Sequence, residues 1–346
     1  MAVLNLNGKP HIDSIEPPCA LPGGELRIVG HDLRPRELHR PAVQVGDVGL
    51  SIAISSDEFV VARVPEGAAS GKLVVAADGH RSNAHAVHIA APVAESLHPV
   101  ANPALDSDGN IYATFSGSRG QKVPVAIFRI DDTQVARPFV VEMMNPTGMA
   151  FGRDGSLYVS SRYDGTVYRV SKTGAMASYA EGMGVATGIA FDRDGSLYVG
   201  DRSGTIFKIG ADRQIFVFAT IEPSVSAYHL AFDDLGNLFV AGPTTSSFDA
   251  VYRVDPLGHV EVYYRGLGRP QGLAFDSKGN LYVAASLHGR RGIVKISPDR
   301  KASLAVSGQN LVGLAFAPGK SVVLATNSAL YRLDWDIEGR RLTPEE

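Results

Sequence analysis

Short runs of alternating apolar and polar residues fill most of the chain, and turn residues separate them. The segment from Gly272 to Val306 is typical: alternating runs cover 272–276, 280–284, 293–296 and 302–306, and a turn at Gly279 separates the first two. Alternation with many β-branched and aromatic residues, between Gly, Asp and Asn turns, is the signature of strands joined as hairpins. The pattern predicts an all-β protein with four short strands in each unit.

One phrase of this pattern recurs about every 40 residues. The turn glycines mark its copies, and the last copy is degraded: Gly109, Gly155, Gly195, Gly236, Gly279 and Gly319. Six four-stranded units of this length predict a six-bladed β-propeller, in which aromatic rings fill the gaps between blades. The last unit lacks an obvious fourth strand, and either residues 339–343 or residues 92–99 could supply it.

An aspartate precedes several of these turn glycines, at Asp106, Asp192, Asp233 and Asp276. Aspartate can accept hydrogen bonds from the backbone two residues on, and glycine can adopt the positive φ that a tight hairpin needs. The aspartates recur with the repeat and are therefore spread around the ring. We interpret them as turn formers and not as a carboxylate cluster.

Residues 10–90 have a different pattern of short strands, which predicts a sandwich of immunoglobulin type. Their motif order, I-x-S-I-x-P, P-G-G, I-x-G, V-x-V-G, V-P and G-x-L-x-V, resembles the IPT/TIG family, which implies an adhesive or architectural module. The later phrase P-x-G-x-A-F-D-x-x-G-x-L-Y-V, clearest at residues 146–159 and 270–283, resembles NHL repeats and SMP-30/gluconolactonase-like propellers. We expect an N-terminal segment (1–9), the immunoglobulin-like domain (10–90), a linker or ring-closing strand (91–100) and the propeller (101–346).

Composition narrows the classes of protein. The 346 residues are 45% hydrophobic with a formal charge of −3, which argues against a basic nucleic-acid-binding protein and against a disordered acidic chain. No apolar run reaches membrane-spanning length, so we expect no membrane partner. The first residues lack the features of a secretory signal, which makes the cytoplasm the default expectation and leaves export open. The single cysteine, Cys19, excludes an internal disulfide.

The central channel is the first candidate site. Aligning the first strands of the repeats gives a column of glycines, and in this column two repeats carry Asn102 and His229 instead. The next position toward one end of the channel carries Tyr228, Thr147, Thr187 and Gln271. Converging polar side chains predict a small-ligand site with His229, Tyr228 and Asn102 as catalytic candidates. The alternative is that these groups only bind channel water or backbone.

The loops between second and third strands form the second candidate site. They carry several cations, Arg119, Lys122, Arg162, Arg202, Arg290 and Arg291, and they also carry His288. Guanidinium groups bind carboxylates and phosphates well, so this face is expected to attract an anion such as a carboxylate, a sugar acid or a phosphate. The alternative is that these cations only form a solvated loop surface. The predicted ligand-binding residues are Thr147, Thr187, Gln271, Arg162, Arg202, His288 and Arg290.

The resemblance to SMP-30-like lactonases implies a divalent cation, such as Ca²⁺, in the channel. However, the inner column has no glutamate and the family's E-G-P and P-N-G phrases are absent, so we predict no metal ligand. The first functional hypothesis is a noncatalytic binding or scaffold protein for a small ligand, such as a sugar acid or lactone, or for a protein. The second is a lactonase-like hydrolase or a streptogramin-lyase-like enzyme. RNA binding ranks third, because basic residues are few and no aromatic ladder accompanies them.

Overall fold

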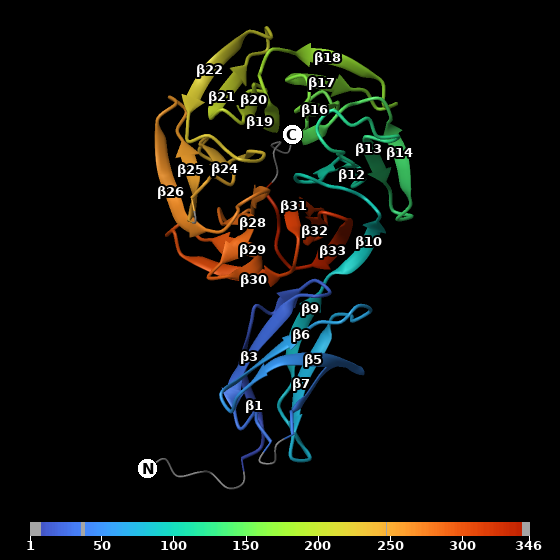
Figure 1. Cartoon of the computed structure of the whole chain (residues 1–346), viewed down its shortest axis with the longest axis vertical. Helices are drawn as coiled ribbons and strands as arrows, with labels where there is room; N and C mark the ends of the chain where they lie inside the picture. Colours follow the sequence, from blue (N-terminus) through green and yellow to red (C-terminus); the bar gives the residue numbers. More distant parts are fainter. Residues whose placement is uncertain (1–7, 36–38, 247, 341–346) are drawn as a thin grey trace. The chain divides into compact units, whose positions relative to one another are not determined.

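The computed structural model describes residues 8–35, 39–246 and 248–340, and in these residues the regular structure is entirely β (Figure 1). The chain divides into two compact units, residues 1–91 with 304–309, and residues 92–303 with 310–346. No helix in the described part has the length and apolar character needed to cross a membrane. The all-β prediction is therefore confirmed.

The first unit is built from nine strands and the end of a tenth. They are β1 (His11–Glu16), β2 (Cys19–Ala20), β3 (Glu25–His31), β4 (Ala42–Val45), β5 (Val48–Ser55), β6 (Phe59–Arg63), β7 (Gly71–Ala77), β8 (His80–Arg81) and β9 (His85–Ile89). They pair in the order β1-β3-β6-β5-β4-β7-β9-β2, with β8 on β7. Strand β2 also pairs in parallel with Val306 and Ser307 of β30 (Ala302–Ser307), which explains why residues 304–309 group with this unit.

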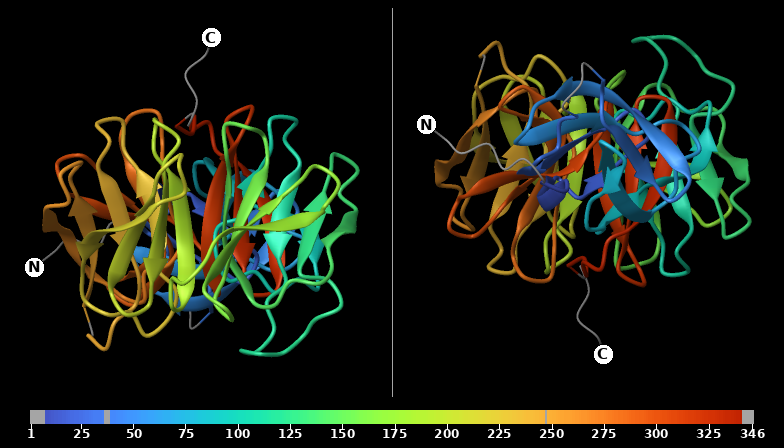
Figure 2. Two further views of the ribbon diagram at one scale, coloured as in Figure 1. Left: turned by 90° about the horizontal axis from the view of Figure 1, so that it is seen from above. Right: turned by 90° about the horizontal axis from the view of Figure 1, so that it is seen from below.

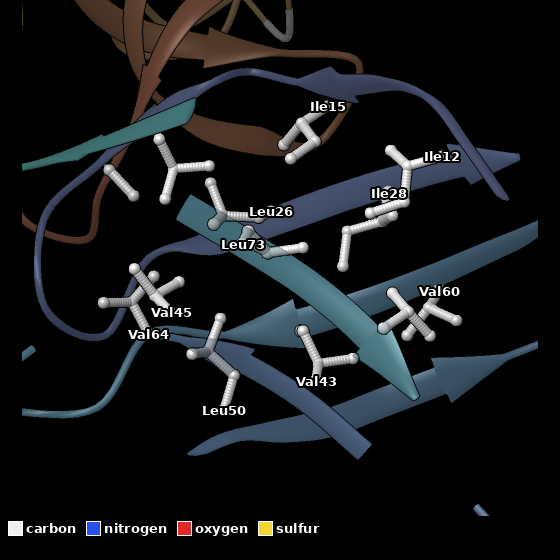
Figure 3. Close-up of a cluster of buried hydrophobic side chains, with 14 of the residues drawn as sticks. Ile12, Ile15, Leu26, Ile28, Val43, Val45, Leu50, Val60, Val64 and Leu73 are labelled. Atoms are coloured by element: carbon white, nitrogen blue, oxygen red, sulfur yellow. The ribbon is translucent and has the colours of Figure 1, made fainter. Parts of the chain in front are cut away.

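A single hydrophobic core lies inside this first unit (Figure 3). Alternate residues of β1, β3 and β6 enter it, among them Ile12, Leu26 and Val60, and so do residues of β4 and β7, among them Val43 and Leu73. Successive side chains of a strand point to opposite faces of the sheet. The strands β1, β3 and β6 and the strands β4 and β7 therefore each have one face directed toward the same core. The strands thus enclose one apolar interior.

The second unit is a β-propeller with five separate four-stranded sheets. Their strand orders are β11-β12-β13-β14, β15-β16-β17-β18, β19-β20-β21-β22, β23-β24-β25-β26 and β10-β33-β32-β31. Figure 1 shows inner strands such as β19 and outer strands such as β22 around a common centre, and Figure 2 shows the same ring from the side. In the fifth repeat, β27, β28 and β29 pair in order, and the segment in the fourth-strand position, β30, is divided between the two units.

The strands of the propeller follow the sequence repeats closely. Their bounds are β10 (Ala91–Glu95), β11 (Ala104–Leu105), β12 (Ile111–Thr114), β13 (Ile127–Ile130), β14 (Ala136–Val140), β15 (Pro146–Phe151), β16 (Leu157–Ser161), β17 (Thr166–Val170), β18 (Met176–Ala180), β19 (Ala186–Phe191), β20 (Leu197–Asp201), β21 (Thr205–Ile209), β22 (Ile215–Thr220), β23 (His229–Phe232), β24 (Leu238–Ala241), β25 (Asp249–Val254), β26 (Val260–Leu267), β27 (Leu273–Phe275), β28 (Leu281–Leu287), β29 (Arg290–Ile296), β31 (Leu311–Ala317), β32 (Ser321–Thr326) and β33 (Ala329–Asp334). Strand β10 joins β33, so the residues just before the first repeat complete the sheet of the last one.

Aromatic rings fill the seams between repeats, as the sequence predicts. In five seams a second-strand ring packs edge-on against a first-strand phenylalanine of the next repeat. These pairs are Tyr112–Phe151, Tyr158–Phe191, Tyr198–Phe232, Phe239–Phe275 and Tyr282–Phe316, with ring centroids 4.9–5.5 Å apart. T-shaped pairs at this distance stabilise beyond their buried area, so the seams hold the ring together.

The repeated aspartates act as turn formers, which confirms that interpretation. Asp276 is buried, and its Oδ1 accepts hydrogen bonds from the backbone N–H of Lys278 (2.9 Å) and Asn280 (2.8 Å). Its Oδ2 accepts from Asn280 Nδ2 at 2.7 Å and from the Tyr282 hydroxyl at 3.2 Å. The same backbone bonds recur at Asp106, Asp192 and Asp233.

Candidate functional site

At the glycines of the column, the backbones of neighbouring first strands are in close contact. These glycines are Gly148, Gly188, Gly272 and Gly313. A Cβ atom on Gly188 would lie 2.4 Å from the Tyr228 carbonyl oxygen, and one on Gly313 would lie 2.7 Å from the Ala101 carbonyl oxygen. Real Cβ contacts are almost never that short, so only glycine fits at these positions. The contact at Gly313 also joins the last repeat to the first.

Asn102 ties three repeats together. Its Nδ2 donates to the Leu273 carbonyl at 2.9 Å, and its Oδ1 accepts from the Leu314 N–H at 3.1 Å. Both ends of the amide are thus bonded to backbone of the fifth and sixth repeats. Neither of these hydrogen bonds involves His229, the other polar residue of the column.

Tyr228 lies in the hydrophobic core next to the second strands of the third and fourth repeats. It is 1% exposed, and its ring lies against Gly200 and Gly242. Its hydroxyl donates to the Glu222 carbonyl. Burial raises the pKa of this phenol, and the charges of nearby acidic groups add to the effect. The hydroxyl is therefore protonated at neutral pH and already engaged.

His229 is the buried imidazole of the inner column, with 4% of its surface exposed. Burial lowers its pKa from 6.5 to about 4, and no hydrogen bond or neighbouring charge contributes. The ring is neutral at pH 7. The threonines of the next column are buried too: Thr147 donates its hydroxyl to the Asn145 carbonyl (3.3 Å) and Thr187 to the Gly200 carbonyl (2.8 Å).

Three arginines of the second-to-third connections form a group that we call the arginine cluster: Arg119, Arg162 and Arg202. One Nη atom of Arg162 donates to the Gly117 carbonyl at 2.8 Å, and one of Arg202 donates to the Val225 carbonyl at 3.0 Å. The Nε atom of each is buried and has no hydrogen-bond partner within the described residues. Burial lowers the pKa of Arg162, and the charges of Arg202 and Arg119 lower it further.

Two acidic side chains of these connections accept hydrogen bonds from their own and from neighbouring loops. Asp201 accepts a hydrogen bond from the Val185 N–H at 2.8 Å. Asp249 accepts from the Thr244 N–H and hydroxyl, both at 2.8 Å, and from the Arg269 N–H at 3.0 Å. Across the described part of the chain, the ion pairs involve other arginines, such as Arg169 with Asp154 and Arg253 with Glu261, and not the arginine cluster. Its positive charge is therefore unpaired locally.

The remaining predicted ligand residues lie at the fifth repeat. Gln271 is half-buried, and its Oε1 accepts from Arg291 Nη2 at 3.3 Å. The same guanidinium also donates to the Leu311 carbonyl at 2.7 Å, so Arg291 fixes the loop before the sixth repeat. His288 is exposed and Arg290 half-buried at the turn that joins β28 to β29.

The residues around the channel do not fit the cation that the lactonase resemblance implies. Hard cations such as Ca²⁺ need several oxygen ligands. Among the residues that the structure describes, no group of three or more His, Cys, Asp or Glu side chains could hold a metal ion. The amide oxygen of Asn102 is already an acceptor for backbone. We therefore derive no chemistry through a metal.

Of the two segments that could complete the last unit, residues 91–95 do so as β10, and residues 338–340 instead contact the fifth repeat; residues 341–343 lie outside the described residues. The Glu338 carbonyl accepts from the Ser277 N–H (2.9 Å), and the Arg340 N–H donates to the Phe275 carbonyl (3.0 Å). The Arg340 side chain, 8% exposed, pairs with Asp234 at 2.7 Å. These contacts lie on first-to-second turns, at the opposite end of the second strands from the arginine cluster. The segment follows the last repeat, so periodicity gave no register for it.

No family model matches the chain, and no curated protein matches it significantly. Solved structures do resemble it. An auxiliary nutrient binding protein from Bacteroides thetaiotaomicron has 10% identity over 94% of this chain and 98% of its own, with a TM-score of 0.57. A protein assigned as a gluconolactonase has 17% identity over 73% and 94%, with a TM-score of 0.60. A catalytically inactive variant of virginiamycin B lyase from Staphylococcus aureus, solved with quinupristin, has 13% identity over 96% and 97%, with a TM-score of 0.50. At these identities the likeness establishes the propeller fold alone.

Proposed function

We propose that this protein is a noncatalytic binding protein that recognises an anionic small molecule, such as a sugar acid, at the arginine cluster. The observation that carries the proposal is the pair of buried Nε donors on Arg162 and Arg202, which have no partner in the described residues. A buried donor left unbonded costs free energy, and like charges close together add to this cost. A carboxylate between the guanidinium groups would relieve both.

The state of the channel residues also favours binding over catalysis. The amide of Asn102 and the hydroxyls of Tyr228, Thr147 and Thr187 all bond to backbone. A catalytic group must reach the reacting atoms, so these groups would first have to break their structural bonds. The arginine cluster, on the second-to-third connections, keeps two Nε donors without partners in the described residues.

We also propose a number of blades for the propeller and a domain type for the first unit. We read the ring as six-bladed, with β27–β30 as its fifth blade, and the first unit as an IPT/TIG-type immunoglobulin-like domain. In support, the fifth repeat contributes to aromatic seams on both sides, Phe239–Phe275 at 4.9 Å and Tyr282–Phe316 at 5.5 Å. The motif order in residues 10–90 and their single core support the domain assignment.

Thermal unfolding with and without gluconate, glucuronate and neutral glucose tests the proposal. At a ligand concentration of 100 times Kd, binding stabilises by about 2.7 kcal/mol, which raises Tm by roughly 5–10 °C for a unit of this size. We expect this rise with the acids and not with glucose. Arg202→Gln should abolish it, and Arg169→Gln, which removes an arginine paired elsewhere, should keep it. A rise that survives in an Arg162→Gln/Arg202→Gln double variant would contradict the proposal.

A lactonase-like or lyase-like enzyme is the second candidate, and the buried neutral imidazole of His229 favours it. A general base at neutral pH must be unprotonated, and this ring is. The test is lactone hydrolysis by the wild type and by His229→Ala. If the wild type hydrolyses the lactone and His229→Ala does not, the channel is an active site and the enzyme hypothesis is supported. If neither protein hydrolyses it, the binding proposal is retained.

A further inference from the structure

The seam between the sixth and first repeats lacks the aromatic pair that the other five seams contain. Val323 lies opposite Arg332, in the register position where Tyr282 lies opposite Lys295. Leu105 lies opposite Ile111, in the register position where Phe151 lies opposite Leu157. Aliphatic side chains thus replace both rings, and Val323 and Leu105 pack into one hydrophobic cluster at this seam.

A groove of about 540 Å³ opens across the same two repeats. The first repeat lines it with its first-to-second and third-to-fourth turns, and the sixth repeat with residues 317–318 and the third strand. The polar and charged side chains in it are Asp108, Asn110, Arg129, Asp131, Asp132 and Arg332. The volume is in the range of about 300–1,000 Å³ that small-molecule sites occupy.

The two arginines of the groove differ from three of their four counterparts in the other repeats. Arg169 pairs with Asp154 at 2.7 Å, Lys208 with Asp192 at 3.8 Å and Arg253 with Glu261 at 3.2 Å, whereas Lys295 of the fifth repeat has no ion pair in the described part of the chain. Within the described ranges we find no ion pair for Arg129 or Arg332. Both guanidinium groups therefore have donors available for a ligand in the groove.

The acidic residues of the groove are of two kinds. The Asp131 carboxylate already has partners: it accepts a hydrogen bond from the Thr133 N–H and forms an ion pair with Arg137. These interactions lower the pKa of Asp131. Asp108 and Asp132 are exposed, and no ion pair of either occurs in the described part of the chain. The groove thus offers two available cations and two available carboxylates, a pattern that complements a molecule carrying both charges.

We propose that this groove binds a short peptide with free termini. The terminal carboxylate binds Arg129 and Arg332, and the terminal ammonium binds Asp108 and Asp132. A site of this volume suits a peptide of a few residues better than a single amino acid. The site is separate from the arginine cluster and lies on the face of the first-to-second turns, so it is independent of the proposed sugar-acid site.

Isothermal titration of the full chain with trialanine, N-acetyl-trialanine and trialanine amide tests the proposal. A hydrogen-bonded charge contact is worth about a factor of ten or more in Kd, so we expect each blocked peptide to bind about tenfold more weakly than trialanine. Arg332→Gln should weaken trialanine about tenfold and leave the amide unchanged, because the amide lacks the carboxylate. Asp108→Asn should weaken trialanine and spare the acetylated peptide.

The matched control is Arg169→Gln, the same change at the equivalent position of the second repeat, which should bind trialanine like the wild type. Circular dichroism and Trp335 fluorescence establish that each variant is folded. Equal affinity for the three peptides, no binding by the wild type at millimolar peptide, or equal losses in Arg332→Gln and Arg169→Gln would each overturn the proposal. If gluconate does not stabilise the protein, the proposed sugar-acid site is contradicted, but the peptide titrations still test the groove. The two sites are therefore tested separately.

Discussion

Replacing His229 with glutamine is expected to remove a specific part of the pH dependence of stability. In the folded state, burial holds the pKa of this imidazole at about 4, against an ordinary value of 6.5. As pH falls below 6.5, the unfolded chain takes up a proton that the folded chain does not. Unfolding is therefore favoured progressively between pH 6.5 and pH 4, and above pH 6.5 the group contributes no pH dependence.

The size of the effect follows from the two pKa values. Each unit of difference corresponds to 1.36 kcal/mol, so the interval from 6.5 to about 4 corresponds to about 3 kcal/mol. His229 is 4% exposed, so little solvent screening reduces this value. The free energy of unfolding of the wild type should fall by about 3 kcal/mol more than that of His229→Gln between pH 7 and pH 4.

Urea unfolding followed by Trp335 fluorescence measures this difference in the propeller alone. The chain has one tryptophan, and its ring lies 5.0 Å from that of Tyr282, inside a seam. His259→Gln is the control, because that histidine is exposed and its surface pair with Asp255 contributes little. If the wild type and His229→Gln lose stability in parallel from pH 7 to pH 4, the reasoning about the buried imidazole is refuted.

Three further changes test the fold. Asp276→Ala leaves four donors without their acceptor, three of them in buried hydrogen bonds, and should cost about 3–5 kcal/mol, whereas Asp194→Ala, an exposed aspartate of another turn, should cost less than about 0.5 kcal/mol; urea midpoints compare them. Gly188→Ala forces a methyl group against backbone and should lower stability by about 1–3 kcal/mol, measured as Tm, and an unchanged Tm would contradict the close approach. Deleting residues 338–346 removes the backbone bonds to Phe275 and Ser277, so protease cleavage near residues 275–280 should become faster than in the wild type.

The sequence predicted the ring because its signals were local and periodic. Each Asp-x-x-Gly turn is determined within five residues, so Asp276 and its relatives could be interpreted from their neighbours alone. The second-strand tyrosines and first-strand phenylalanines recur at fixed positions in each repeat. Their packing in the seams followed directly from that repetition.

The prediction was weaker where a residue departs from the repeat. Asn102 replaces a glycine of the column, and the sequence could not show that its amide bonds to two other repeats. Strand β30 looked like an ordinary fourth strand, but Val306 and Ser307 pair with Cys19 and Ala20 far away in the sequence. Such long-range partners leave no periodic signal, so they had to be found in the structure.

The ring geometry explains why the available polar groups are found at its surface. Backbone contacts at Gly188 and Gly313 bring the first strands so close that polar atoms in this layer have neighbouring backbone within reach. Asn102 accordingly bonds to backbone of the fifth and sixth repeats, and the Thr187 hydroxyl accepts a hydrogen bond from the Tyr228 N–H of the next repeat. The connecting loops are free of this constraint, and there the arginine cluster keeps donors without partners in the described residues. In a fold that closes through its inner strands, the connections can therefore change in sequence without opening the ring, and this is why we place the proposed binding site there.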